Sequence, residues 1–410
     1  MSRYEKVKRS IIIIVIIIVA IFSSINARER RIRKEKNNQE VKIMEEYNSD
    51  IIRTTFEEKN YLISPYNIKM ALNMLKEGAD GNTKDEIEKV IGNEKVNNIN
   101  IKNKLSVANG IFIKNDFKSS VKKEFTNIMN NKYHSEIIYD DFKTPKVINN
   151  WVKEKTNGMI DKVLDKIEEN SIMGIASALA LDIKWLDTFN CLDTKKEEFT
   201  KIDNNKMNTV MMRQTYEANA KYVKGDKEEG IIIPYNTETS DVELEFVGLL
   251  PKSNISDYVR NIDINKINNL INNARETSDK LHVILSLPRF SYSYEVEDFI
   301  LSLKKIGIND VFSPRLANLS KISDTSGIYV GEAIHKTKID LNEDGTKASA
   351  VTYFNVMYKG APLFEQNFEE IDLKFNKPFV YMIREKNTGE ILFFGTVYEP
   401  SVWKGNACYN

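Results

Sequence analysis

Apolar residues in the N-terminal half of the chain recur three or four positions apart, the period of one face of an α-helix. Ile68, Ala71, Leu72 and Leu75 have this spacing and predict a helix that ends at Gly78. Thr83 and Glu86 stand at the spacing of a capping box and predict that the next helix begins there. A further helical pattern covers 147–163 and is interrupted by an Asn-Gly pair.

Short, continuous apolar runs predict strands, and most of them lie in the second half of the chain. In chain order the predicted strands cover 61–64, 108–113, 231–234, 242–250, 282–287, 328–339, 379–383 and 391–397. A short helix is predicted at 296–303. Helices gather early and strands late, without the alternation of βαβ units, so the order of elements predicts an α+β fold.

The N-terminus has the pattern of a targeting segment. Basic residues precede an unbroken apolar run over 11–22, as in a secretory signal, and the run is short for the roughly 20 residues of a bilayer span. We expect residues 1–27 to be a signal peptide cleaved after Ala27, with an uncleaved membrane anchor through 11–27 as the alternative. The charged stretch 28–44 lacks apolar periodicity and predicts a linker rather than a surface-binding arm. The expected location is extracellular, as a secreted or a membrane-anchored protein.

Composition narrows the possible functions. With 410 residues, 41% of them hydrophobic, the chain is long enough for a large core. Lys+Arg and Asp+Glu both number 59, so no basic bias indicates a nucleic-acid partner. There are only three histidines, and no metalloprotease, nucleophile-elbow, phosphate-loop or dinucleotide motif occurs. We therefore predict neither an enzyme, nor a metal site, nor a cofactor.

Two cysteines, Cys191 and Cys408, are too few for a disulfide scaffold or a four-cysteine zinc site. Two unpaired thiols are the simplest interpretation. A single bridge between them is the alternative, because sequence alone does not place their Cα atoms.

The stretch 343–352 has a pattern of its own. Small residues occupy alternate positions: Thr346, Ala348, Ala350 and Thr352. Alternate residues of an extended strand face the same side, so such a strand could enter between two others without displacing core volume. Gly345 relaxes backbone limits where a hinge turns. On pattern alone a polar surface strand is the simplest interpretation.

Several ordered motifs resemble the serpin family. They are NYLISP at 60–65 with GADGNT at 78–83, INNWV at 148–152 with KTNGMI at 155–160, LPRF at 287–290, ANLS at 317–320, FNKPF at 375–379 and FG at 394–395. The likeness covers 45–400 and implies one monomeric domain there, with three β-sheets, about nine helices and an exposed reactive-centre loop at about 343–372. Residues 401–410 remain as a C-terminal tail.

The resemblance implies that the protein is a suicide inhibitor of a serine protease. A serine protease cuts the loop, the freed segment joins the central sheet as a new strand, and the acyl-enzyme stays trapped in a covalent complex. The implied hinge residues are Glu343, Gly345, Thr346, Ala348, Ser349, Ala350 and Thr352. No large side chain occupies their inward face before Phe354, which favours an inhibitor over a non-inhibitory carrier or chaperone.

The family's cleaved bond follows the residue sixteen positions beyond the hinge glutamate, which here is Lys359, before Gly360. Lys359 is also the only basic residue between Ala348 and Leu373. A lysine fits the specificity pocket of a trypsin-like protease, whereas Tyr358, one position earlier, would suit a chymotrypsin-like enzyme.

The segment after the predicted bond is longer than in typical serpins. Residues 363–373 contain Glu365, Glu369, Glu370 and Asp372. They are interpreted as a lengthened surface loop, or else as an acidic docking site for a basic protease surface.

The resemblance also implies a polar cluster where the central sheet opens. Ser64 and His335 match the family pattern, whereas Asn67 and Ser177 look exchanged. Asparagine and serine both donate and accept, so we expect a hydrogen-bond network to survive the exchange, with His335 as a structural partner. Trp185 is expected to cover the upper entry point of the sheet.

Two glycosylation sequons begin at Asn254 and Asn318. Asn318 lies inside a family motif, so Asn254 is the favoured site.

Overall fold

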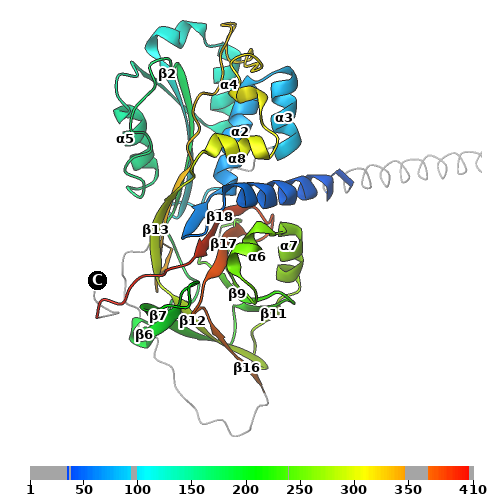
Figure 1. Cartoon of the computed structure of the whole chain (residues 1–410), viewed down its shortest axis with the longest axis vertical. Coiled ribbons are helices and arrows are strands. Elements are labelled where there is room, and N and C mark those ends of the chain that lie inside the picture. The colour runs from blue at the N-terminus through cyan, green and yellow to red at the C-terminus, as the bar shows by residue number, and fades with distance from the viewer. Residues whose placement is uncertain (1–34, 37, 94–98, 239, 347–367, 406–410) are drawn as a thin grey trace, which may run out of the picture.

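The computed structural model describes residues 35–36, 38–93, 99–238, 240–346 and 368–405. Helices surround the upper part of the molecule, strands run through it to the lower end, and one helix over 38–55 crosses the middle (Figure 1). The other helices are α2 (Pro65–Gly78), α3 (Gly81–Ile91), α4 (Lys123–Tyr133), α5 (Lys146–Lys155), α6 (Ile255–Arg260), α7 (Ile264–Asn272) and α8 (Phe299–Lys305). The short 3-10 turns are η1 (Asn115–Ser120), η2 (Cys191–Asp193) and η3 (Asp310–Phe312).

A seven-stranded antiparallel sheet forms the centre of the core, in the order β1-β18-β17-β10-β9-β8-β11. Its strands are β1 (Tyr61–Ile63), β8 (Lys221–Lys224), β9 (Glu228–Pro234), β10 (Leu244–Pro251), β11 (Arg275–Glu276), β17 (Phe379–Glu385) and β18 (Ile391–Val397). Every residue of β10, β17 and β18 is buried, which explains why these strands are near-continuous apolar runs in the sequence.

A four-stranded sheet, β16-β12-β7-β6, forms the lower end of the molecule (Figure 1). Its strands are β6 (Lys195–Thr200), β7 (Lys206–Tyr216), β12 (Leu281–Pro288) and β16 (Glu369–Lys374).

Two further groups of strands run through the upper part, in the orders β3-β2-β4 and β13-β14-β15-β5. Their members are β2 (Leu105–Lys114), β3 (Glu136–Asp140), β4 (Met173–Leu181), β5 (Ile183–Lys184), β13 (Phe290–Glu295), β14 (Lys336–Leu341) and β15 (Gly345–Thr346). Only Asp182 separates β4 from β5, so the two groups are connected halves of one sheet that is parted between β4 and β14. The observed mixture of helices and largely antiparallel sheets confirms the α+β prediction.

The capping-box prediction is wrong. Helix α3 begins after Asp80, whose side chain makes no capping hydrogen bond. Thr83 instead accepts the amide of Asn318 at 3.0 Å, and Glu86 accepts the amide of Asp310 at 2.8 Å. Both side chains therefore hold the segment around η3 against α3.

Two predicted elements extend too far. Helix α5 ends at Lys155 because Asn157 and Gly158 adopt positive φ angles of 51° and 75°, and no helix follows within 159–163. Of the strand predicted at 328–339, only β14 forms, and residues 328–335 are not part of a strand.

The predicted linker 28–44 is partly helical. Within the predicted linker, residues 38–44 are helical and continue into 45–55, and Met44 is buried. Residues 1–27 lie outside the described structure. Among the residues that are described, no helix has both the length and the apolar character for crossing a membrane.

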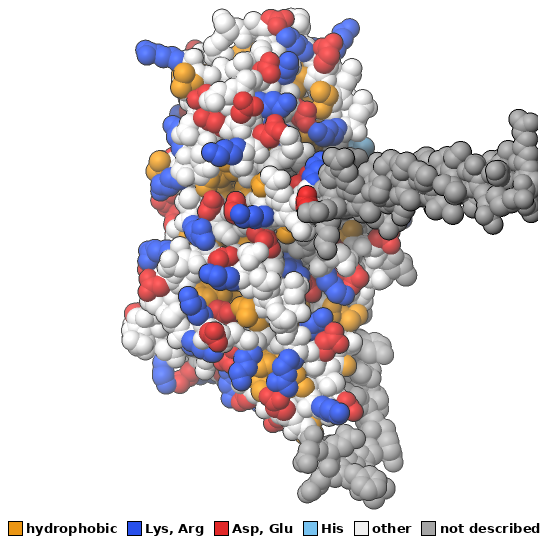
Figure 2. All heavy atoms as spheres, turned by 90° about the vertical axis from the view of Figure 1, so that its right-hand side faces the viewer, with side chains coloured by type: hydrophobic (Ala, Val, Ile, Leu, Met, Phe, Trp, Pro, Cys, Tyr) orange, Lys and Arg blue, Asp and Glu red, His pale blue; other side chains and the backbone are white. Residues whose placement is uncertain are grey.

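On the face seen in Figure 2, acidic and basic side chains are interspersed.

Candidate functional site

The hinge begins as a short strand between two others. In β15, Gly345 pairs with Lys184 and Thr346 with Ile183 of β5, and on the opposite edge Thr346 pairs with Leu341 of β14. A Cβ atom at position 345 would lie 2.1 Å from the carbonyl oxygen of Ile183, so only glycine fits there. The structure therefore places Gly345 and Thr346 between β5 and β14 at one end of the parted sheet, whereas Ala348, Ser349, Ala350 and Thr352 lie outside the described residues.

Thr346 is the first small residue of the alternating pattern, and its side chain points into the protein. It is 2% exposed, and its hydroxyl lies 2.7 Å from the Tyr235 hydroxyl. The Tyr235 ring stacks on Trp185 with 4.6 Å between ring centroids. Burial raises the pKa of Tyr235 above its ordinary value, so its hydroxyl stays protonated and available for this bond.

Trp185 directly follows β5 and lies against the turn before the hinge. Its indole N–H donates to the Asn342 carbonyl and its backbone N–H to the Asp344 carbonyl, each at 2.9 Å. These two bonds fix the turn that leads from β14 into the hinge.

The hinge glutamate is held by an ion pair that the sequence did not predict. The Arg289 guanidinium donates two hydrogen bonds, of 2.5 and 2.6 Å, to the two carboxylate oxygens of Glu343. Both side chains are largely buried, at 15% and 8% exposure. Thr194 donates a further hydrogen bond of 2.6 Å to the carboxylate. Arg289 stood within a recognised motif, but nothing in the motif indicated which acid it pairs with.

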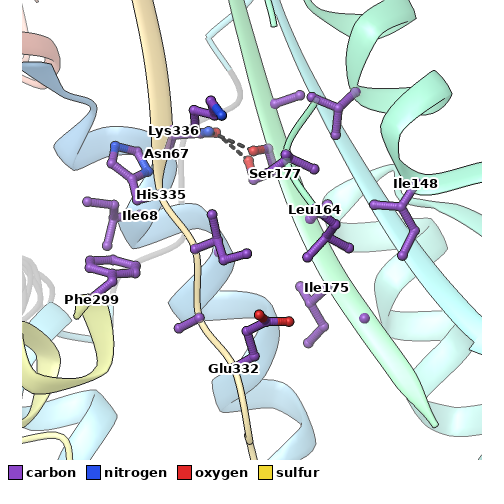
Figure 3. Close-up of a pocket in the computed structure, with 18 of the residues that line it drawn as sticks. Asn67, Ile68, Ile148, Leu164, Ile175, Ser177, Phe299, Glu332, His335 and Lys336 are labelled. Carbon is purple, nitrogen blue, oxygen red and sulfur yellow. Dashed lines mark hydrogen bonds between the residues drawn. The ribbon is translucent and has the colours of Figure 1, made fainter. Parts of the chain in front are cut away.

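Beside the hinge, a groove with a volume of about 730 Å³ separates β4 from residues 328–335. Apolar side chains dominate its lining; those labelled in Figure 3 are Ile68, Ile148, Leu164, Ile175 and Phe299. Strand β4 pairs with β2 along one edge, and in the described structure its other edge pairs with no strand. The groove thus contains an unpaired strand edge and an apolar floor, and it begins next to the hinge residues Gly345 and Thr346.

The predicted opening cluster forms on one side of this groove. Asn67 donates to the Ser177 carbonyl at 2.7 Å, and the Ser177 hydroxyl donates back to the Asn67 side-chain oxygen at 2.5 Å (Figure 3). The exchanged pair therefore makes two complementary hydrogen bonds between α2 and β4.

His335 makes the connection on the other side. Its Nε2 atom accepts the Ser64 backbone N–H at 2.9 Å, and the Ser64 hydroxyl accepts the Asn67 N–H at 3.2 Å. Burial lowers the pKa of His335 to about 3, so the imidazole is neutral and able to accept. The first turn of α2 thereby bridges the two sides of the parted sheet.

Comparison with known proteins decides the family. A family model described as serpin (serine protease inhibitor) matches residues 45–400.

The chain belongs to the serpin family.

Its curated relatives include inhibitors by name. Human (Homo sapiens) neuroserpin is 27% identical over 378 residues, which cover 85% of this chain and 88% of the relative. Glia-derived nexin of Rattus norvegicus is 30% identical over 367 residues, 83% of this chain and 88% of the relative. Plasminogen activator inhibitor 1 of Neovison vison is 27% identical over 375 residues, 84% and 88% of the two chains. The serpin is thus related to protease inhibitors rather than to catalytic enzymes.

Solved structures agree with the fold. The thermophilic serpin tengpin in its native state is 29% identical, with a TM-score of 0.76 over 88% of this chain and 94% of tengpin. Tengpin in its latent state gives 0.71 at 27% identity over 88% and 98%.

The acidic segment of the serpin is partly a strand. Residues 369–373, predicted as surface loop, belong to β16, which pairs in parallel with β12, so the loop prediction is wrong there. Glu369 is neutralised by a bidentate contact with Arg275 of 3.2 and 2.6 Å, and Asp372 lies 2.9 Å from Lys374. Glu369 and Asp372 are thus each paired with a basic residue of the same chain. Glu365 lies outside the described residues.

Both glycosylation sequons lie in the described part of the chain. Asn254 is exposed and caps α6 by accepting the amides of Ser256 and Asp257. Asn318 is exposed as well, although its backbone carbonyl accepts the Asp80 amide at 3.0 Å. Exposure therefore does not distinguish the two sequons. The predicted scissile residues 358–360 lie outside the described structure.

Cys191 is disulfide-bonded, and the described part of the serpin contains no free cysteine. The prediction of unpaired thiols is therefore wrong for Cys191, which lies in the exposed 3-10 turn η2. Cys408 is outside the described residues.

Proposed function

We propose that this serpin is a suicide inhibitor of an extracellular trypsin-like serine protease and is cleaved between Lys359 and Gly360. The observation that carries the proposal is the hinge strand β15, paired on both edges at the head of a groove with an unpaired strand edge. The start of a new strand thus lies beside an unpaired strand edge along which the rest of the segment could pair.

The energetic argument starts from the unpaired edge. An inserted segment would form on the order of ten to twenty backbone hydrogen bonds, each worth about 0.5–1.5 kcal/mol net. Even the low end is comparable with the roughly 5–15 kcal/mol that stabilises a typical domain. The intact form would then be kinetically trapped, and cutting the loop releases it.

Insertion explains trapping because the protease is still attached as an acyl-enzyme when the segment moves. The ester is carried away with the loop, the protease active site is distorted, and deacylation stalls. A lysine before the cut supports a trypsin-like target, whose specificity pocket contains a buried carboxylate.

Mixing the secreted serpin with trypsin and separating the products on a denaturing gel tests the proposal. We expect a covalent adduct of serpin and protease, which Lys359→Ala abolishes because the specificity pocket loses its cation. Lys347→Ala is the matched control, since it removes a lysine from the same loop and should leave the adduct intact.

Other products would point elsewhere. An adduct that persists in Lys359→Ala would contradict the cleaved bond, and an adduct with chymotrypsin instead would indicate Tyr358. Cleavage without any adduct would indicate a non-inhibitory serpin, such as a carrier.

A further inference from the structure

Residues 157–172 connect α5 to β4 along the groove and form neither a helix nor a strand. Four apolar side chains of this segment line the groove: Ile160, Val163, Leu164 and Ile167. They also pack against a small core cluster around Trp151 of α5. Figure 3 labels Leu164 together with Ile175 of β4 among the lining residues. The segment is therefore part of one wall of the groove.

Hydrogen bonds fasten the segment to the half of the sheet that contains β4. The Asn149 side chain of α5 accepts the amides of Val163 and Leu164 at 2.9 Å each and donates to the Leu164 carbonyl at 2.8 Å. At the end of the segment, the Lys114 backbone N–H of β2 donates to the Ile172 carbonyl at 2.9 Å. The segment thus moves with β2 and β4, and its charged side chains are carried on that half.

Asp161, an exposed residue of the segment, lies within the influence of a lysine on the other half. Its carboxylate pairs with Lys153 of α5 at 2.9 Å. Lys153 lowers the pKa of Asp161, and Lys338 of β14 lowers it further. The carboxylate is therefore attracted both to its own half of the sheet and to the opposite half.

Asp165 repeats this arrangement four positions later. It pairs with Lys162 inside the segment. Lys162 lowers the pKa of Asp165, and Lys336 of β14 adds to the effect. The two acids follow each other along the segment as the two lysines follow each other, in the reverse direction, along β14. Two negative charges on one side of the groove thus match two positive charges on the other.

The match ends at the next position along the groove. Glu332 borders the groove from the half that contains β14 (Figure 3), and the residue of the segment that acts on it most strongly is another acid, Glu168. Burial raises the pKa of Glu332 and Glu168 raises it further, whereas Lys166, which pairs with Glu168 at 2.7 Å, opposes this rise. The attraction between the two sides is therefore confined to the positions of the two aspartates.

We propose that residues 157–172 form an electrostatic strap across the groove, in which Asp161 and Asp165 on one half of the parted sheet attract Lys338 and Lys336 on the other. Opposite charges at exposed positions attract weakly and are screened by salt, so this strap can open. A strand that enters the groove has to pass the apolar side chains of the segment. That the strap controls this entry rests on the proposed function, whereas the strap itself does not.

Hydrogen exchange of the intact protein tests the strap without a protease. The amides of Val163 and Leu164 report on it, because their hydrogen bonds to Asn149 break when the segment lifts. Reversing both charges on β14, with Lys336→Glu and Lys338→Glu in one chain, should speed their exchange at least about threefold, because attraction becomes repulsion and local opening is easier. The difference from the wild type should shrink in about 0.5 M NaCl, where the charges are screened.

A matched control and a second background separate charge from other effects. Lys224→Glu with Lys227→Glu makes the same change in net charge at exposed positions away from the groove, and should leave the exchange of the two amides unchanged. In a chain that already contains Asp161→Asn and Asp165→Asn, the reversals on β14 should no longer speed exchange, because the charges they act on are absent.

Either of two results would overturn the strap: unchanged exchange after the reversals on β14, or equal acceleration with and without the two aspartates. The trypsin adduct is measured in parallel on the same proteins. An adduct without an exchange response removes only the strap, whereas an exchange response without an adduct removes only the proposed inhibition.

Discussion

Thr346 is the first inward-facing residue of the hinge, and its environment shows what insertion requires of a single side chain. Its hydroxyl is satisfied by Tyr235 while only 2% of the residue is exposed. A larger or charged side chain would have to displace the stacked Tyr235 and Trp185 rings or bury its charge without a partner, which is costly.

Thr346→Arg is therefore expected to turn the inhibitor into a substrate. Trypsin should still cut the loop, but insertion should stall and the enzyme should be released, which a denaturing gel would show as cleaved serpin without adduct. Lys347→Arg, at the neighbouring position predicted to face solvent, is the control and should trap normally. Undiminished trapping by Thr346→Arg would contradict insertion through this site.

His335 gives a pH-dependent prediction. Burial lowers its pKa to about 3 from the ordinary 6.5, so below pH 6.5 the unfolded chain binds a proton that the folded chain does not. Its contribution to the free energy of unfolding should fall by up to about 1.4 kcal/mol per pH unit between roughly pH 6.5 and pH 3. Urea unfolding of the wild type and His335→Gln over this range measures the difference, which should shrink as the pH falls. A pH-independent difference would mean that His335 has the same pKa in the folded and the unfolded chain, contrary to its burial in the fold.

At the scale of elements, the hydrogen bonds between α2 and β4 hold one edge of the groove. Asn67 and Ser177, both half-buried, form two of them, and truncating one partner removes both bonds. Asn67→Ala should lower the free energy of unfolding by about 0.5–1.5 kcal/mol.

Because the two residues share their bonds, adding Ser177→Ala to Asn67→Ala should cost less than the sum of the two single changes. Urea unfolding of the four proteins measures this coupling. Strict additivity would show that the pair does not act as a unit.

The sequence predicted best the elements whose patterns are complete in themselves. Buried strands such as β10, β17 and β18 need only a run of apolar residues, and each was predicted from such a run. Residues 328–335 have the composition of a strand but border the groove instead. They form no strand because the groove separates them from β4, the strand that they would pair with. The pairing of Arg289 with Glu343 could not be predicted from the sequence either, because it joins segments far apart in the chain.

At the scale of the whole molecule, the proposed insertion predicts that the intact protein is not in its most stable form. The apolar floor and the open edge of β4 are features that a folded chain ordinarily covers. The likeness to tengpin in both its native and its latent state is in keeping with a fold that supports two arrangements.

The melting temperature of the nicked chain tests this claim most directly. After the loop is cut by a metalloprotease, which forms no acyl-enzyme and therefore cannot be trapped, the nicked serpin should melt at least about 10 °C higher than the intact one, because insertion adds several kcal/mol of stability. Equal or lower melting of the nicked chain would show that no strand has entered the sheet, and would contradict the account.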